Sequence, residues 1–179
     1  AQKILYRVAG SGTFVAQKTP IQKVATLMSF TKEMRELGLN PSTKVNTFMV
    51  KKADSKIASI LGINENDMVY FIERSRYANS DLYVFEKTYM PVKSNPDISI
   101  KILEGSKYEY VEKVRGIKLD YSYHQVFPIL PNKKLSEMFQ IGENVPIIKI
   151  ANTTYLEDGS ILDFTELFLN SPKYQLNYI

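Results

Sequence analysis

The sequence predicts an α+β fold in which helices pack on one antiparallel sheet. Strand-like segments come in pairs across short polar turns, as at 68–77 and 82–90, and this pattern is typical of β-hairpins. Residues 56–86 and 134–163 also repeat one order of elements, which is a short helix, a loop with a glycine, a strand, a turn and a strand. We expect two similar halves that share the sheet, with helices on one face and a cleft between the halves, where ligands prefer to bind.

The first part of the chain predicts a hairpin, a linker and a helix. Apolar stretches flank Gly10-Ser11-Gly12 in a hairpin over 6–15, and the polar segment 16–23 with one proline is typical of a linker. Apolar residues at helical spacing predict a helix over 24–37, which Gly38 would end.

The later elements follow from the same signals. Asp54 is the expected N-cap of a helix at 54–61. The remaining expected elements are a strand at 45–50, the hairpin 68–77 and 82–90, a helix at 106–115 closed by Gly116, a strand at 118–129 broken by Pro128, a short helix from Pro131-Asn132 to Phe139, and strands at 146–155 and 161–170.

Composition excludes several classes of protein. The 179 residues are 44% hydrophobic and 23% charged, which suits a soluble domain with a core and room for a ligand. There is no cysteine, and His124 is the single histidine, so we expect no disulfide, thiolate nucleophile, metal site or cofactor. No apolar run approaches the roughly 20 residues of a membrane helix, and the lack of cysteine is compatible with a reducing cytoplasm. The formal charge of +4 permits an anionic partner.

Arg74 and Arg76 are the first candidate binding residues. They stand two apart on a predicted strand, so both side chains leave the same face, behind the apolar Tyr70 and Ile72. Buried guanidinium groups need anionic partners and can bind phosphate or carboxylate through two hydrogen bonds. The partner could be a ligand or a local carboxylate such as Glu86, or the arginines could lie at a solvated strand end.

Glu86 and Asp163 are equivalent carboxylates of the repeat, each in an otherwise apolar strand. Such a pair could perform acid/base work as in glycosidases, could accept hydrogen bonds from hydroxyls or an amine, or could pair with the arginines.

Three weaker candidates remain. Ser106-Lys107-Tyr108 opens a predicted helix and could form an anion site, or Ser106 could simply cap the helix. Within 29–31, Phe30 is most simply a core residue and Ser29 most simply faces solvent. His124 has no nucleophile motif beside it, so we expect no catalytic residue.

Several motifs together resemble the HutC-type branch of the GntR transcriptional regulators. The string G-S-G-T-F-V at 10–15, directly before a linker, looks like the end of a winged helix-turn-helix. Further segments resemble the UTRA ligand-binding domain of that branch. They are L-M-S-F-T-K-E-M at 27–34, G-L-N-P at 38–41, I-E-R-S-R-Y-A at 72–78, Y-M-P at 89–91, T-T-Y at 153–155 and Tyr174.

The resemblance implies a chorismate-lyase-like fold and a cytoplasmic, homodimeric repressor. It also implies a small anionic effector, most simply a sugar phosphate or amino-sugar phosphate. It implies that Arg74, Arg76, Ser106 and Tyr108 hold the anionic end, that Glu86 and Asp163 contact the polar part, and that Ser29, Phe30 and Thr31 close over the ligand. The wing residues implied to contact DNA are Arg7, Gly10, Ser11, Gly12 and Thr13.

We therefore expect a wing remnant at 1–16, a linker at 17–23 and an effector domain at 24–179. The recognition helix of a winged helix-turn-helix reads bases in the major groove, and we expect it before Ala1, so operator DNA is a partner of the full-length protein only. The competing hypotheses are an enzyme of chorismate-lyase-like fold acting on a small carboxylate, and a dimerisation module without a ligand.

Overall fold

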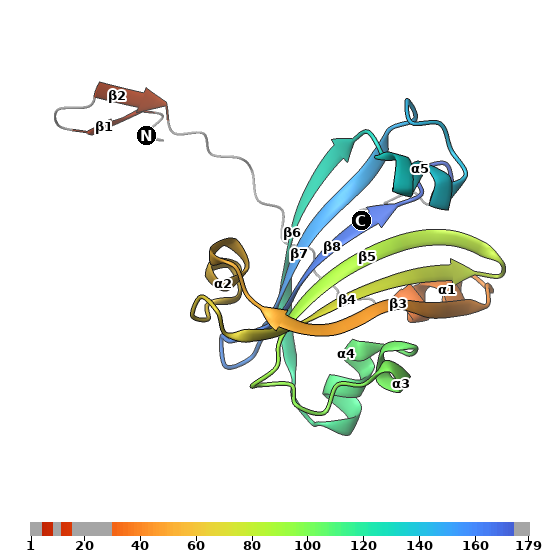
Figure 1. Cartoon of the computed structure of the whole chain (residues 1–179), viewed down its shortest axis with the longest axis horizontal. Coiled ribbons are helices and arrows are strands. Elements are labelled where there is room, and N and C mark those ends of the chain that lie inside the picture. Colours follow the sequence, from red (N-terminus) through yellow and green to blue (C-terminus); the bar gives the residue numbers. More distant parts are fainter. Residues whose placement is uncertain (1–4, 9–11, 16–29, 174–179) are drawn as a thin grey trace.

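The computed structural model describes residues 5–8, 12–15 and 30–173, and its centre is one six-stranded antiparallel sheet (Figure 1). The strand order is β3-β4-β5-β8-β7-β6. The strands are β3 Pro41–Lys52, β4 Met68–Ala78, β5 Asp81–Pro91, β6 Leu119–Ile129, β7 Ile147–Leu156 and β8 Ile161–Leu169. The helices are α1 Phe30–Glu36, α2 Ser55–Leu61, α3 Ile100–Leu103, α4 Lys107–Glu109, the π-helix η1 Tyr110–Val114, and α5 Lys133–Phe139.

The predicted repeat is confirmed and is longer than the sequence indicated. Each half runs strand, helix, strand, strand, as β3-α2-β4-β5 and then β6-α5-β7-β8. The two halves meet where β5 pairs with β8, and there Thr88 lies opposite its repeat equivalent Thr165. A local twofold axis therefore passes between these two threonines.

The two helices of the repeat begin and end in the same way. Asp54 and Asn132 precede α2 and α5, and each side chain accepts a hydrogen bond from the backbone N–H three residues later, at 2.8 Å and 3.0 Å. Both helices end on a left-handed residue, which is Gly62 in α2 and Gln140 in α5. The predicted N-cap role of Asp54 is confirmed.

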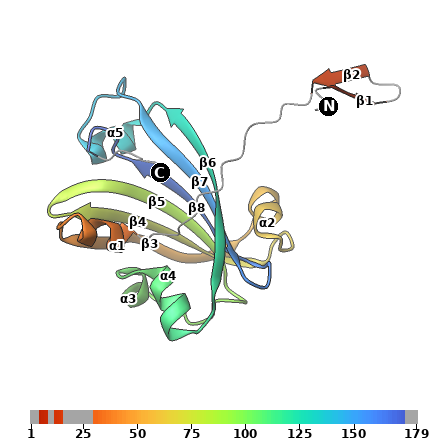
Figure 2. The same cartoon turned by 180° about the vertical axis from the view of Figure 1, so that it is seen from behind.

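Helices cover both faces of the sheet, so the expectation of helices on one face is wrong (Figures 1 and 2). On one face, α2 packs on Val69 and Phe164, and α5 packs on Phe85 and Phe168. On the other face, α1, α3 and η1 pack on residues that alternate with these along the strands. Successive side chains of a strand point to opposite faces, and both sets here are apolar enough to need a cover.

Several predicted boundaries differ from the structure. The predicted helix at 106–115 is α4 followed by the π-helix η1, after an unexpected α3, while Gly116 closes it with a φ of +66° as expected. Strand β6 continues through Pro128, although a break was predicted there. Since β6 is an edge strand, the missing N–H of a proline can be tolerated there. Strand β3 starts at Pro41, earlier than predicted, and α1 is described only from Phe30 onward.

The predicted N-terminal hairpin is present as a separate two-stranded sheet. Its strands are β1 Leu5–Val8 and β2 Gly12–Val15, paired from Leu5 opposite Val15 to Val8 opposite Gly12. Of the expected tip, Gly12 begins β2, while Gly10 and Ser11 lie outside the described residues, as does the expected linker. No helix in the described part of the chain is long and apolar enough to span a membrane.

The shared capping of α2 and α5 gives a first prediction. Replacing either cap, as Asp54→Ala or Asn132→Ala, leaves a helix N–H without its partner and should lower the free energy of unfolding by about 1 kcal/mol. Urea unfolding of each variant measures this loss. The exposed Ser59→Ala within α2 is the control, and it should stay within about 0.5 kcal/mol of the parent. An equal loss in Ser59→Ala would contradict the assignment.

Candidate functional site

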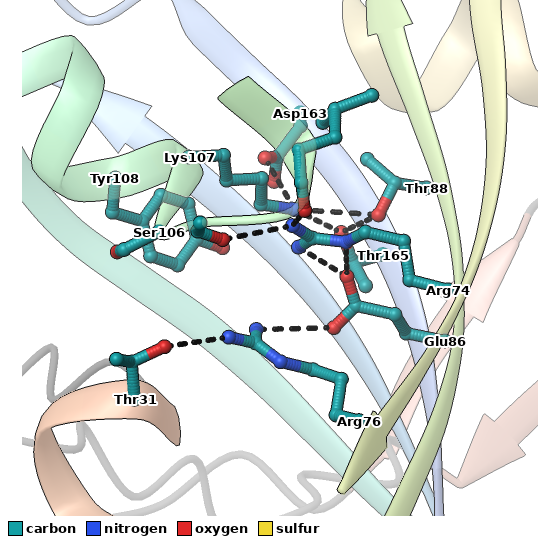
Figure 3. Close-up of polar contacts among 12 residues, drawn as sticks. Thr31, Arg74, Arg76, Glu86, Thr88, Ser106, Lys107, Tyr108, Asp163 and Thr165 are labelled. Carbon is teal, nitrogen blue, oxygen red and sulfur yellow. Dashed lines mark hydrogen bonds and ion pairs between the residues drawn. The ribbon is translucent and has the colours of Figure 1, made fainter. Parts of the chain in front are cut away.

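Five charged side chains are buried in the described part of the chain, and all lie on the face covered by α1, α3 and α4 (Figure 3). They are Arg74, Arg76, Glu86, Lys107 and Asp163, and none is more than 6% exposed. Charges buried to this degree must be paired with one another or with a ligand. The first two come from β4, Glu86 from β5, Lys107 from α4 and Asp163 from β8.

Arg74 is held on all sides by the protein itself. It lies opposite Glu86 in the β4–β5 register, and its Nε and Nη2 both contact Oε1 of Glu86. Its Nη1 donates to the carbonyl of Leu103 at 2.8 Å and, at 3.5 Å, to that of Gly105. Arg74 thus ties the segment after α3 to the centre of the sheet.

Arg76 is held more loosely. Its Nη1 lies 3.5 Å from Oε2 of Glu86, and its Nη2 donates to Oγ1 of Thr31 at 3.1 Å. Its guanidinium lies over the ring of Phe30, 4.9 Å from the centroid. The buried Nε of Arg76 has no hydrogen-bond acceptor. Burial lowers the pKa of Arg76 to about 10, so it stays charged at neutral pH.

Glu86 is the anion that both arginines share. Burial alone would raise its pKa, but the charge of Arg74, followed by those of Arg76 and Lys107, outweighs burial and lowers the pKa from 4.5 to about 2. Glu86 is therefore a carboxylate at neutral pH, and it is not suited to donate a proton as a general acid.

Lys107 is a site residue that the sequence analysis did not select. Its Nζ lies 2.9 Å from Oδ2 of Asp163 and donates to Oγ1 of Thr165 at 3.0 Å and of Thr88 at 3.3 Å. Those two hydroxyls are also 2.9 Å apart, on the local twofold axis. Burial lowers the pKa of Lys107, and Asp163 opposes that effect.

The repeat itself contained the signal for Lys107. With Tyr77 aligned to Tyr155, the equivalents of Arg74 and Arg76 in the second half are the uncharged Asn152 and Thr154. Asp163 therefore has no cation on its neighbouring strand, and its partner had to come from outside the repeat.

A cluster of hydroxyl and amide groups lies beside Asp163. The phenol of Tyr108 is 2.9 Å from Oγ1 of Thr154, which is 3.3 Å from the hydroxyl of Ser122. Asn152 donates to the phenol at 3.2 Å. Burial raises the pKa of Tyr108, so the phenol stays neutral. The buried Oδ1 of Asp163 accepts no hydrogen bond, so this end of the site offers an acceptor to a ligand.

A model of the UTRA domain matches residues 36–175 of this chain. The chain belongs to the UTRA family. Four similar proteins show the range of similarity.

Two relatives are named repressors. The mannosyl-D-glycerate transport/metabolism system repressor MngR of Escherichia coli is 28% identical over 178 residues, which cover 99% of this chain and 74% of MngR. The transcriptional repressor NagR of Bacillus subtilis is 24% identical over 171 residues, which cover 96% of this chain and 70% of NagR.

Two solved structures share the fold. The regulator YydK of Bacillus subtilis superposes with a TM-score of 0.77 at 21% identity, covering 98% of this chain and 75% of that one. The effector domain of PhnF from Mycobacterium smegmatis superposes with a TM-score of 0.79 at 17% identity, and the match covers 88% of this chain and 97% of that domain. This UTRA domain thus has the α+β architecture that the sequence predicted.

The UTRA fold brings together most of the residues predicted for the site. Arg74, Arg76, Glu86, Tyr108 and Asp163 converge, and Thr31 and Phe30 reach Arg76 from α1. Ser106 does not join them through its hydroxyl, which accepts from the N–H of Glu109 at 3.3 Å as an N-cap. Ser29, Gly10 and Ser11 lie outside the described residues. Arg7, Gly12 and Thr13 lie in β1 and β2, whose side chains are not described.

Glu86 gives a second prediction, which concerns stability against pH. Its folded pKa lies below its ordinary value, so its contribution is present above pH 4.5 and is lost as pH falls toward 2. In Glu86→Gln this part of the pH dependence disappears. The difference in unfolding free energy between the parent and this variant should therefore shrink by on the order of 3 kcal/mol across that window.

Urea unfolding at a series of pH values measures the difference. Glu157→Gln, at a 59% exposed side chain paired with Lys118, is the control and should follow the parent at every pH. Parallel curves for the parent and Glu86→Gln would show that Glu86 is not held as a buried carboxylate.

Proposed function

We propose that this chain is the effector-sensing and dimerisation part of a bacterial repressor. A small anionic metabolite, with sugar phosphates as the first class to test, would control its binding to operator DNA in the cytoplasm. The buried Arg76, whose Nε lacks an acceptor inside a UTRA fold, is the observation that most supports this function. The repressor names of MngR and NagR support the regulatory part.

Arg76 is suited to bind an anion because its present contacts within the protein are weak. The contact with Glu86 is long at 3.5 Å, and Arg74 already meets the other oxygen of that carboxylate. A phosphate or carboxylate could bind the free Nε and one Nη in the fork geometry that arginine favours. Glu86 and Asp163 both face cations, and this speaks for ligand binding over acid/base catalysis. We propose that the domain releases its effector unchanged.

The signal would pass through α1. Thr31 and Phe30, at the start of α1, contact Arg76 in the structure. An anion on Arg76 would change the partner of Thr31 and so the position that α1 prefers. We propose 1–16 as the wing remnant, 17–23 as the linker and 24–179 as the effector domain, so α1 lies just after the linker to the DNA-binding head. A ligand shifts operator affinity only by its different affinities for the two states.

We propose that β6 is the dimerisation edge. In the described part of the chain, no strand pairs with its outer side. Exposed apolar side chains gather on and beside it, with Val126 43%, Phe127 42% and Leu130 64% exposed. Asp120 is its one residue charged at neutral pH, because burial lowers the pKa of His124. The opposite edge strand, β3, carries Lys44, Lys51 and Lys52. Lysines protect edges from pairing, whereas an edge strand without lysine can pair antiparallel with its own copy.

Arg76 gives the prediction for sensing. We expect a binding sugar phosphate to raise the melting temperature of the parent and to weaken operator binding by the full-length protein. Arg76→Ala should lose the temperature gain and weaken ligand affinity about a hundredfold, because charged hydrogen bonds of 1.5–3 kcal/mol each are removed. Thermal shift, calorimetry and a DNA mobility assay measure these effects.

Lys118→Ala, at a 76% exposed side chain, is the control for charge and should bind like the parent. Recovery of the intact ligand after long incubation checks that no reaction occurs. Unchanged affinity in a folded Arg76→Ala, or turnover of the ligand, would refute the proposed sensor.

The β6 edge gives the prediction for assembly. Phe127→Lys places a charge at the proposed junction between two copies, so we expect the dimer dissociation constant to rise at least about tenfold. Sedimentation velocity over a dilution series measures it. Met49→Lys, at a 50% exposed apolar residue of the other edge strand, is the matched control and should leave the dimer intact. A dimer lost in Met49→Lys and kept in Phe127→Lys would place the interface on β3.

A further inference from the structure

We infer that His124 connects the buried site to the proposed dimer edge, and that through His124 the dimer weakens as the pH falls. The inference rests on the proposed function, because it takes β6 as the edge along which two copies pair. It adds a positioning residue that acts on the site through Asn152 and not through contact with an effector.

His124 stands at the end of a row of polar side chains that crosses the sheet. Thr88 lies opposite Thr165 on the local twofold axis. On the next strand Asn152 lies opposite Thr165, and on β6 His124 lies opposite Asn152. Residues directly opposite each other on paired strands project from the same face of the sheet. The row therefore runs on the face of the buried charged cluster, from the local axis to the edge strand.

The two halves of the repeat end this row differently. In the first half, Arg74 lies opposite Val45 of the edge strand β3. In the second half, its repeat equivalent Asn152 lies opposite His124 of the edge strand β6. An apolar side chain thus ends the row at one edge of the sheet, and a titratable side chain ends it at the edge that we propose for dimerisation.

Asn152 links His124 to the polar groups of the site. Its Nδ2 donates to the phenol of Tyr108 at 3.2 Å and to Oγ1 of Thr154 at 3.4 Å. The amide oxygen is then the atom of Asn152 that is left for His124. Burial lowers the pKa of His124, and a hydrogen bond with Asn152 opposes that effect. Because a protonated imidazole can only donate hydrogen bonds, the orientation of the Asn152 amide affects whether His124 is charged.

The surroundings of His124 contain no charge that would compensate a proton. The groups in its row and beside it from β7 and α4, Asn152 and Tyr108, are uncharged. Asp163, on β8, is already paired with Lys107 at 2.9 Å. On β6 itself, Asp120 stands four positions before His124. No charged group is among the causes of the pKa shift of His124.

Pairing of two copies along β6 would oppose protonation further. Side chains directly opposite on paired strands lie about 4.5–5.5 Å apart, so a second β6 would withdraw the half-buried His124 from water. Burial disfavours the charged form of histidine. A proton therefore binds the separated copies more readily than the dimer, and acidification favours the separated copies.

The dimer dissociation constant tests the edge side of the inference. The chain has one histidine and no cysteine, so His124 is the one side chain whose ordinary pKa lies between pH 5 and 8. We expect the constant to rise about tenfold from about pH 8 to pH 5, with the change below the ordinary value of 6.5. His124→Gln should have the same constant at both pH values. Asp120→Asn, which removes the carboxylate of the same strand, is the matched control and should keep the dependence. Sedimentation velocity over dilution series measures all three proteins.

The NMR titration of His124 tests the site side. Since the chain has a single histidine, its ring signals report its pKa without assignment by mutation. Tyr108→Phe removes the acceptor that orients the Asn152 amide, so we expect the pKa of His124 to fall. Tyr110→Phe makes the same change at an exposed phenol that donates to Asp97, and it should leave the titration unchanged. Melting curves confirm that the variants are folded.

The possible failures are distinguishable. The inference is overturned if the dimer constant is equal at both pH values, if His124→Gln keeps the pH dependence, or if Tyr108→Phe leaves the titration of His124 unchanged. In each of these cases a dimer weakened by Phe127→Lys still supports β6 as the edge. If Phe127→Lys leaves the dimer intact, the proposed edge fails and the inference fails with it.

Discussion

The buried pair of Arg74 and Glu86 is the interaction on which the rest of this site depends. Both side chains are removed from water, and breaking such a pair by deleting one partner typically costs 3–5 kcal/mol. The pair also extends outward, because Arg74 donates to the carbonyls of Leu103 and Gly105. That contact fixes the chain directly before α4, and it therefore determines where Lys107 and Tyr108 enter the interior. The pair leaves Glu86 ionised, and it commits Nε and Nη2 of Arg74 to Glu86 while Nη1 is committed to the two carbonyls.

The repeat duplicates the backbone but not the charges. Thr88 and Thr165 meet on the local axis, and Glu86 and Asp163 stand two residues before them on equivalent strands. The cations are placed differently, on β4 in the first half and on α4 in the second. One end of the site is therefore rich in guanidinium groups, and the other end is rich in hydroxyl and amide groups around Tyr108. A ligand with an anionic end and a hydroxylated end has one favourable orientation in such a site.

Local patterns predicted most of the fold and part of the site. Strands β4, β5, β7 and β8 could be predicted from alternating polar and apolar residues and from the turns between them. Helix α2 could be predicted from its N-cap, Asp54. The same-face spacing of Arg74 and Arg76 indicated a buried pair. The predictions that failed or stayed open concern contacts between residues far apart in the chain. Whether Ser106 caps a helix or binds an anion, whether Pro128 breaks a strand, and which face a helix covers all depend on neighbours far away in the chain. Lys107 looks like any lysine beside a serine until α4 is packed over Asp163. The asymmetry of the repeat, with Asn152 in the place of Arg74, was the one sequence feature that could have indicated it.

The two arginines have different roles in the proposed function, since Arg74 holds the site together and Arg76 binds the ligand. If a ligand had to displace Arg74 from Glu86, it would lose several kcal/mol before gaining any contact. Binding at Arg76 has no such cost, because the contact between Arg76 and Glu86 is long and the Nε of Arg76 has no hydrogen-bond acceptor. The bond that a ligand would replace is the one to Thr31. Exchange of that single hydrogen bond to a hydroxyl for one to an anionic oxygen leaves the sheet intact and changes only the attachment of α1. Reversible sensing needs this combination of a rigid core pair and a weakly held neighbour, because the ligand must shift an equilibrium without unfolding the site that binds it.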